Sequence, residues 1–171
     1  MDPPGFFHLH SVGRASLSIV LRPRGGDWLA DDIRTLSRAG VRVLVSMLTP
    51  EEEEELELVR EGECCKAVNI EFLSVPVADL GTPKDLQRFE SAVAKVLEAL
   101  KRRRSVAVHC RQSIGRSGML TSATLVALGF PLDKALAATS RARGVLVPET
   151  PQQRLWLEQN AQRFGPSDAV D

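Results

Sequence analysis

Hydrophobic and polar positions alternate in blocks that predict strands and helices in turn along the chain. Short apolar, β-branched runs predict strands, and apolar residues at helical spacing predict helices. The predicted strands cover residues 16–21, 41–47, 68–75 and 105–108. The predicted helices cover residues 28–38, 51–61, 83–103, 116–128, 131–141 and 150–164. This alternation predicts a single α/β domain, in which helices flank both faces of a central, largely parallel, twisted sheet.

Capping signals mark three of the predicted helix starts. Asp27 is expected to cap the first helix, Thr49-Pro50 the second and Thr82 the third. Asp85 follows Thr82 by three residues, where a carboxylate satisfies amides of the first helical turn. Capping therefore accounts for Asp85 without a catalytic role.

The segment between the strand at 105–108 and the helix at 116–128 carries the clearest chemical signal. Residues 109–118 read His-Cys-Arg-Gln-Ser-Ile-Gly-Arg-Ser-Gly. The backbone N–H groups of such a loop can converge on one point, at which the positive end of the following helix dipole is also aimed. The thiol of Cys110 is expected to lose its proton easily in this field. This setting favours a reactive cysteine over a small apolar core residue.

The pattern His-Cys-x5-Arg-Ser-Gly at a strand–loop–helix junction resembles the signature of the cysteine-based protein tyrosine phosphatases. The compact chain and the segment Pro148-Glu149-Thr150-x-x-Gln153 look most like the dual-specificity branch of that superfamily. The resemblance extends from about residue 22 to residue 157, and its central motif is the specific part. It implies the dual-specificity phosphatase fold and a metal-independent hydrolysis of phosphate monoesters through a phosphocysteine.

The resemblance also implies roles for individual residues. Cys110 would be the nucleophile, and Arg116 would bind two phosphoryl oxygens with its planar guanidinium group. Ser117 would assist departure of the thiolate, with an ordinary serine of the first helical turn as the open alternative. His109 would order the loop by hydrogen bonding. The phosphate would be held by the loop residues Arg111, Gln112, Ser113, Ile114, Gly115 and Arg116.

The reaction also needs a general acid on a loop that reaches the leaving oxygen. Asp79 lies in the glycine-containing loop after the strand at 68–75 and matches the acid position of the family, with an ordinary Asx turn as the alternative. It would protonate the leaving group and then activate water. Gln153 resembles the residue that places this water in the family. The alternatives at that position are the adjacent Gln152 or a polar residue on an exposed helical turn.

Ser113 departs from the family pattern, which usually has glycine at the third position of the loop. A serine held there in a strained backbone conformation costs on the order of 1–3 kcal/mol. On this reasoning, Ser113→Gly is expected to preserve or raise turnover.

The expected partner is a phosphorylated protein carrying phosphotyrosine or phosphoserine/threonine. A phosphoinositide, nucleotide or RNA phosphatase is the main alternative, but Arg111 is the only extra cation of the loop. A rhodanese-like sulfurtransferase typically has one residue fewer in its loop. A catalytically dead phosphate-binding module would be expected to lose Cys110, Arg116 or Asp79, and the chain has all three. A weakly active phosphate-binding module is a less favoured alternative.

Composition excludes several other classes of protein. The 171 residues fit one domain, expected at 1–165 with a loose tail at 166–171, and the 22 basic and 22 acidic residues leave no net charge. General affinity for nucleic acid or membrane surfaces is therefore not expected. No apolar run approaches the ~20 residues of a membrane span, and no signal peptide is recognised. Three cysteines indicate free thiols, and we expect a cytoplasmic monomer.

The remaining features have structural interpretations. The three histidines, His8, His10 and His109, have no zinc-like arrangement with the cysteines, and no cofactor is implied. Cys64-Cys65 are interpreted as core cysteines, with a resolving thiol for oxidised Cys110 as the alternative. Trp28 and Trp156 are expected in the core. The run 51–55 is interpreted as a solvated helix start and the basic run 101–104 as a helix end.

Overall fold

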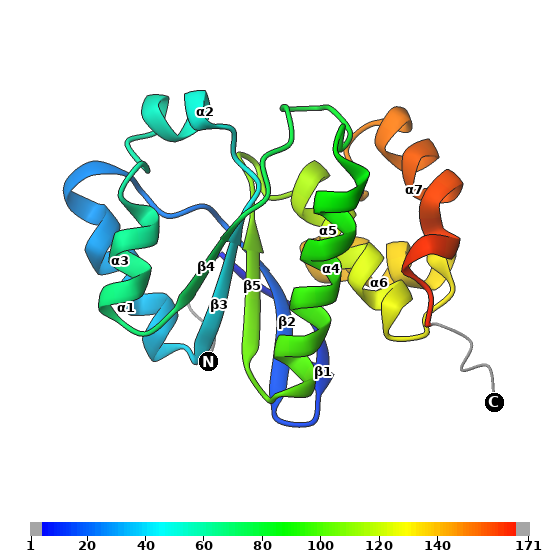
Figure 1. Ribbon diagram of the computed structural model, residues 1–171, viewed down its shortest axis with the longest axis horizontal. Coiled ribbons are helices and arrows are strands. Elements are labelled where there is room, and N and C mark those ends of the chain that lie inside the picture. The colour runs from blue at the N-terminus through cyan, green and yellow to red at the C-terminus, as the bar shows by residue number, and fades with distance from the viewer. Residues whose placement is uncertain (1–4, 167–171) are drawn as a thin grey trace.

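A five-stranded, largely parallel sheet lies at the centre of the computed structural model, which describes residues 5–166 (Figure 1). Residues 1–4 and 167–171 lie outside the described part, so most of the predicted tail does too. The strands are β1 (Phe6–Val12), β2 (Ala15–Val20), β3 (Val41–Ser46), β4 (Glu71–Ser74) and β5 (Ser105–His109). Their order is β1-β2-β5-β3-β4, and only the edge strand β1 pairs antiparallel with its neighbour. The predicted fold class is confirmed.

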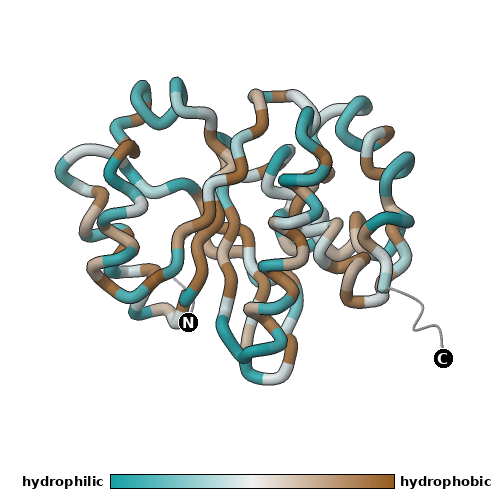
Figure 2. Tube along the Cα trace, in the orientation of Figure 1, coloured by the Kyte–Doolittle hydropathy of each residue, from teal (hydrophilic) through white to brown (hydrophobic). Residues whose placement is uncertain are grey.

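Helices cover both faces of this sheet (Figure 1). They are α1 (Leu29–Arg38), α2 (Pro50–Glu55), α3 (Glu61–Ala67), α4 (Leu86–Lys101), α5 (Gly115–Ala127), α6 (Leu132–Arg143) and α7 (Pro151–Phe164), with a 3-10 turn η1 at Gly26–Trp28. Successive residues of a strand point to opposite faces of the sheet, so a separate core forms on each face. Val43 and Val45 pack with the residues of α4 and α5, whereas Leu44 packs with those of α1 and α3. The brown segments of Figure 2 follow these strands and the inner sides of the helices.

Helix α5 is buried from Gly115 to Val126. Close packing against the loop before α7 depends on Gly118, since a Cβ there would lie 2.2 Å from Cγ1 of Val147. A helix enclosed in this way has little freedom to move. The loop that feeds it is therefore anchored firmly at its C-terminal end.

Several predicted helix boundaries are wrong. The helix predicted at 51–61 ends already at residue 55, because the chain turns through Glu57 at a φ of +56°, and the helix α3 that begins at Glu61 was not predicted. Asp27 lies within η1 and does not cap α1. The long helix α4 begins at Leu86, not residue 83, and its N-cap is Asp85, whose carboxylate accepts a hydrogen bond from the Arg88 amide at 2.9 Å, rather than Thr82.

The strand pattern also missed β1 and overestimated β4. The residues of β1 are mostly half-buried, because only one neighbour, β2, covers this edge strand, so their hydrophobic alternation is weak. Residue 69 belongs to a turn with a φ of +58°, which delays β4 until residue 71. Trp28 is 57% exposed and lies under the Arg24 guanidinium, so the prediction that it is a core residue is wrong. Trp156 is partly buried and packs edge-on against buried Phe89, so its prediction as a core residue is confirmed only in part.

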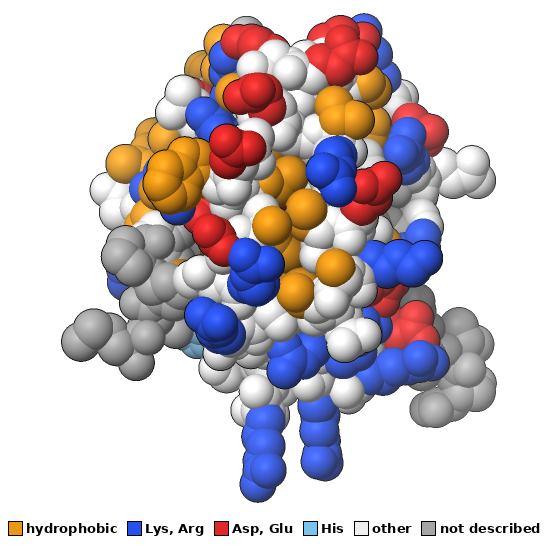
Figure 3. Space-filling view, turned by 90° about the vertical axis from the view of Figure 1, so that its left-hand side faces the viewer, with side chains coloured by type: hydrophobic (Ala, Val, Ile, Leu, Met, Phe, Trp, Pro, Cys, Tyr) orange, Lys and Arg blue, Asp and Glu red, His pale blue; other side chains and the backbone are white. Residues whose placement is uncertain are grey.

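The face formed by η1, α1 and α3 has a shallow depression with apolar side chains at its centre and charged ones around it (Figure 3). Exposed Val59 and half-buried Cys64 line this depression. The neighbouring Cys65 is fully buried in the core on this face, and its burial raises the pKa of the thiol to about 12. Cys110 belongs to the core on the other face. The geometry thus supports the interpretation of Cys65 as a core cysteine, whereas Cys64 is only partly buried against that core.

Candidate active site

The loop 110–114 lies where β5 ends and α5 begins, at the carboxyl edge of the parallel strands, as predicted. The N-cap of α5, Ile114, makes no side-chain hydrogen bond to the first turn, as is also the case for the N-caps of α1, α3 and α6. The first amides of α5 are therefore left for another acceptor. An anion at this point would also lie at the positive end of the helix dipole.

Cys110 is buried at the base of the loop and is 2% exposed. Its Sγ lies 3.4 Å from the hydroxyl oxygen of Ser117, which is also buried. This contact brings together the two residues that were predicted to supply the nucleophile and the donor to its thiolate.

Arg116 is buried although its side chain is charged, with 1% of its surface exposed. Its terminal nitrogens donate to both carboxylate oxygens of Glu52, at 2.6 and 2.9 Å, and to the backbone carbonyl of Val77 at 2.8 Å. Burial alone would lower the pKa of Arg116, but hydrogen bonds to Glu52 and the nearby negative groups raise it. The guanidinium group is therefore held charged and in one orientation.

Glu52 is a site residue that the sequence interpretation missed. The run 51–55 was expected to be solvated, yet Glu52 is only 7% exposed. Its carboxylate accepts the Thr49 amide at 3.0 Å, while the Thr49 hydroxyl accepts the Glu52 amide, which makes a capping box. Burial would raise the pKa of Glu52, but hydrogen bonds from Arg116 and the Thr49 amide lower it. The spacing Thr49-x-x-Glu52 was the available signal, because it orients this glutamate at the end of β3.

Asp79 lies beside Arg116, with an oxygen 2.9 Å from one of its terminal nitrogens. The same oxygen accepts the amide of Leu80, whose φ of +58° turns the loop. The carboxylate remains 45% exposed and is open to solvent. The structure therefore brings the predicted acid to the predicted phosphate-binding arginine, whereas Asp85 serves as the N-cap of α4.

Gln153 lies between the loop of Asp79 and the phosphate loop. It is fully buried, and its side-chain amide donates to the carbonyl of Gly81 at 3.0 Å. On its other side it approaches the phosphate loop so closely that a Cβ at Gly115 would lie 2.8 Å from Oε1. The alternative of a polar residue on an exposed turn is therefore wrong for Gln153, whereas Gln152 is exposed.

The two residues on either side of Cys110 make contacts of different kinds, one buried and one exposed. His109 is buried, and its Nε2 lies 2.8 Å from a carboxylate oxygen of buried Glu61 in α3, so its hydrogen bond goes to a helix rather than into the loop. Arg111 points outward and donates through both terminal nitrogens to Glu55, at 3.0 and 2.7 Å. These bonds raise the pKa of Arg111. The extra cation of the loop is thus already paired.

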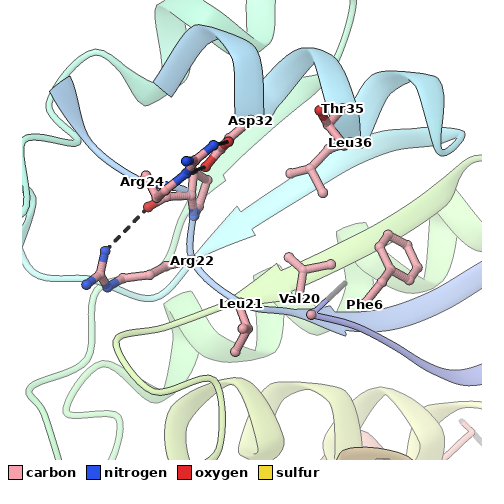
Figure 4. Close-up of a pocket in the computed structure, with 10 residues that line it drawn as sticks. Phe6, Val20, Leu21, Arg22, Arg24, Asp32, Thr35 and Leu36 are labelled. Atoms are coloured by element: carbon pink, nitrogen blue, oxygen red, sulfur yellow. Dashed lines mark hydrogen bonds and ion pairs between the residues drawn. The ribbon is translucent and has the colours of Figure 1, made fainter. Parts of the chain in front are cut away.

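A pocket of about 430 Å³ lies beside this loop, between the end of β2 and α1 (Figure 4). Its wall is apolar and includes Phe6, Val20 and Leu36. At its mouth Arg24 forms an ion pair with Asp32 at 2.6 Å. Val20 joins the pocket to the phosphate loop, because its carbonyl accepts the hydroxyl of Ser113.

Within residues 5–166, no three histidine, cysteine or acidic side chains form a cluster that could hold a metal ion. None of the described helices is both long and apolar enough to cross a membrane.

Comparisons with known proteins agree with this fold. Residues 20–130 match the family described as "Tc-R-P: Polymorphic toxin system, DSP-PTPase phosphatase". Among curated proteins, none matches this chain. Among solved structures, kinase associated phosphatase, in a variant whose catalytic cysteine is replaced by serine, is similar with a TM-score of 0.83 at 19% identity, over 93% of this chain and 94% of that one.

Two further structures have the same fold. Tk-PTP in its active form gives a TM-score of 0.76 at 20% identity, over 94% of this chain and 98% of that one. PTPMT1, in complex with PI(5)P, gives 0.73 at 19% identity, over 91% of this chain and 95% of that one. The resemblance to the cysteine-based phosphatases that the motif implied is confirmed.

Proposed function

Because the chain belongs to the DSP-PTPase phosphatase family, we propose that it hydrolyses phosphate monoesters without a metal ion, through a phosphocysteine intermediate at Cys110. One observation carries this proposal. The side chains of Arg116 and Asp79 form an ion pair where α5 begins without a side-chain cap, five residues after Cys110 in the sequence. An anion-binding loop, a thiol and a carboxyl group are the parts that this reaction needs.

In the first step, the Cys110 thiolate attacks phosphorus, so that an S–P bond forms as the P–O bond to the leaving group breaks. The loop amides and Arg116 stabilise the charge on the phosphoryl oxygens. Asp79, protonated at this stage, gives its proton to the leaving oxygen. Phosphate has to displace the Asp79 carboxylate from Arg116, and the released carboxyl group would take up a proton from solvent before it faces the leaving oxygen.

In the second step, Asp79 accepts a proton from water as the water attacks phosphorus, and the S–P bond breaks to release phosphate. Ser117, 3.4 Å from Sγ, stabilises the departing thiolate through its hydroxyl group. Gln153 orients the water, because it lies between the loop of Asp79 and Gly115. Its amide nitrogen donates one hydrogen bond to Gly81, which leaves its second N–H available.

For the substrate we favour a phosphorylated protein over a phosphoinositide, nucleotide or RNA. The pairing of Arg111 with Glu55 carries this choice, because it neutralises the one cation besides Arg116 within the loop sequence itself, which a polyanion could otherwise use. The apolar pocket next to Val20 suits a side chain that flanks the phosphorylated residue. The family description refers to polymorphic toxin systems. That the protein is cytoplasmic and monomeric remains a prediction from the sequence.

The test compares the purified protein with Cys110→Ser on an aryl phosphate. We expect the variant to lose turnover and to keep its affinity for inorganic phosphate, because the loop amides and Arg116 are unchanged. Retained turnover in Cys110→Ser would show that the cysteine is not the nucleophile. Rates on phosphotyrosyl peptides, phosphothreonyl peptides and inositol phospholipids would then rank the substrate classes.

A further inference from the structure

Ser113 occupies the one position of the loop whose backbone is left-handed, with a φ of +54°. Its side chain is fully buried, and its hydroxyl donates to the carbonyl of Val20 at 2.6 Å. The same oxygen lies 3.5 Å from the amide of Cys110. The hydroxyl thus connects the loop to the end of β2 and to the residue that carries the nucleophile, two contacts that a glycine cannot make.

Arg143, in the last turn of α6, holds the same part of the loop from outside. It donates from Nε to the carbonyl of Ser113 at 2.8 Å and from a terminal nitrogen to the carbonyl of Gln112 at 3.2 Å. Its guanidinium lies over the ring of Phe7 in β1, 4.3 Å from the ring centroid. A cation held between two carbonyls and an aromatic face has a fixed position.

These contacts control the direction of two peptide planes. In a trans peptide the N–H points opposite to the C=O. When Arg143 holds the carbonyls of Gln112 and Ser113 outward, the amides of Ser113 and Ile114 must point to the inner side of the loop. The inner side is where the amides of such a loop converge on a bound anion.

We propose that Arg143 and the Ser113 hydroxyl are positioning residues that preorganise the phosphate loop, a role that rests on the proposed phosphatase function. The hydroxyl holds the left-handed residue that glycine occupies in the related phosphatases, and Arg143 orients the amides on either side of it. The expectation that Ser113→Gly preserves or raises turnover is therefore reversed: glycine relieves strain but frees the loop, so its affinity for oxyanions falls.

The experiment measures the dissociation constant of orthovanadate, the values of kcat and KM for an aryl phosphate, and hydrogen exchange at the amides of Ser113 and Ile114. Arg143→Ala and Ser113→Gly are each expected to weaken vanadate binding roughly five- to tenfold, as the loss of one or two hydrogen bonds implies. The same two amides should exchange faster. Arg141→Ala is the matched control, because Arg141 is exposed on the same helical turn and contacts no loop carbonyl among the described residues.

Two further variants separate positioning from general stability. Arg143→Lys keeps the charge but cannot hold both carbonyls, so intermediate affinity is expected from a folded protein. The double variant Ser113→Gly/Arg143→Ala should lose less affinity than the sum of the single losses, because both residues hold the same peptide planes.

The outcomes distinguish this inference from the proposed function. The inference is overturned if the wild type binds vanadate while Arg143→Ala, Arg143→Lys and Ser113→Gly, each folded, bind it equally well. A lower melting temperature with unchanged vanadate affinity would give both residues a merely structural role and also overturn it. If the wild type neither binds vanadate nor hydrolyses the aryl phosphate, the proposed phosphatase function itself is wrong.

Discussion

Glu52 accepts hydrogen bonds from both terminal nitrogens of Arg116, at 2.6 and 2.9 Å, and both side chains are buried. A bidentate pair of this kind fixes the plane of the guanidinium group. Glu52 is held in turn by the amide of Thr49, the N-cap of α2. The orientation of the phosphate-binding arginine is therefore set from α2, a helix of six residues that is distant from the loop in sequence.

Glu52→Gln is expected to lower kcat/KM for an aryl phosphate about 10- to 100-fold, because a neutral amide leaves the buried Arg116 charge without its partner. It should also lower the free energy of unfolding by roughly 3–5 kcal/mol, the usual cost of breaking a buried ion pair. Steady-state kinetics and denaturant unfolding measure the two effects. Glu54→Gln, in the same helix but exposed, is the control and should change neither quantity.

Asp79→Asn should reduce kcat most for substrates with poor leaving groups, because these depend most on protonation of the leaving oxygen. A series of aryl phosphates whose phenols differ in acidity measures this dependence. Asp85→Asn is a suitable control, since asparagine also caps helices well and Asp85 caps α4. An equal loss across the series would contradict the assignment of Asp79 as the acid.

Glu55→Gln should release Arg111 from its ion pair and increase the positive charge beside the phosphate loop. We expect the ratio of kcat/KM for a bisphosphorylated substrate to that for a monophosphorylated one to rise several-fold, and more at low ionic strength. Glu54→Gln removes one negative charge as well, so it controls for the effect of net charge on the electrostatic field of the whole protein. If both variants shift the ratio alike, Arg111 does not select between substrate classes.

The pH dependence of stability follows from the lowered pKa of Glu52. Above the ordinary glutamate pKa, Glu52 is ionised in both the folded and the unfolded chain, and its ion pair contributes in full. This contribution is lost as the pH falls through the lower pKa of the folded state. The difference in unfolding free energy between the wild type and Glu52→Gln should therefore be largest near neutral pH and shrink in acid. If the difference in unfolding free energy increased at acidic pH, the lowered pKa of Glu52 in the folded protein would be contradicted.

Local patterns predicted the parts of the site that one segment contains. The strand–loop–helix order around Cys110 follows from apolar runs and small residues between them, so Cys110, Arg116 and Ser117 could be placed from the sequence. Asp79 could be placed too, because it follows a strand whose carboxyl end meets that of β5 at one edge of the sheet.

Contacts between distant segments could not be predicted in this way. The burial of Glu52 depends on a guanidinium group 64 positions away, while its neighbours in the acidic run are exposed or partly buried. Arg143 in α6 and Phe7 in β1 meet only because the sheet order places the β1–β2 hairpin near that helix. Hydrophobic periodicity gives the elements but not these pairings, which tertiary packing decides.

The separation of the two cores has a consequence for how the protein withstands oxidants. Cys110 lies in the core on one face of the sheet, whereas Cys64 and Cys65 lie on the other. A sulfenic acid formed on Cys110 would have the sheet between itself and both remaining thiols. An internal disulfide would require Cys64 or Cys65 to reach the core on the opposite face, so reduction of the sulfenic acid would depend on a small thiol or a reductase from outside the chain. Recovery of the Cys110 thiol after oxidation would therefore depend on reductants in the surrounding solution.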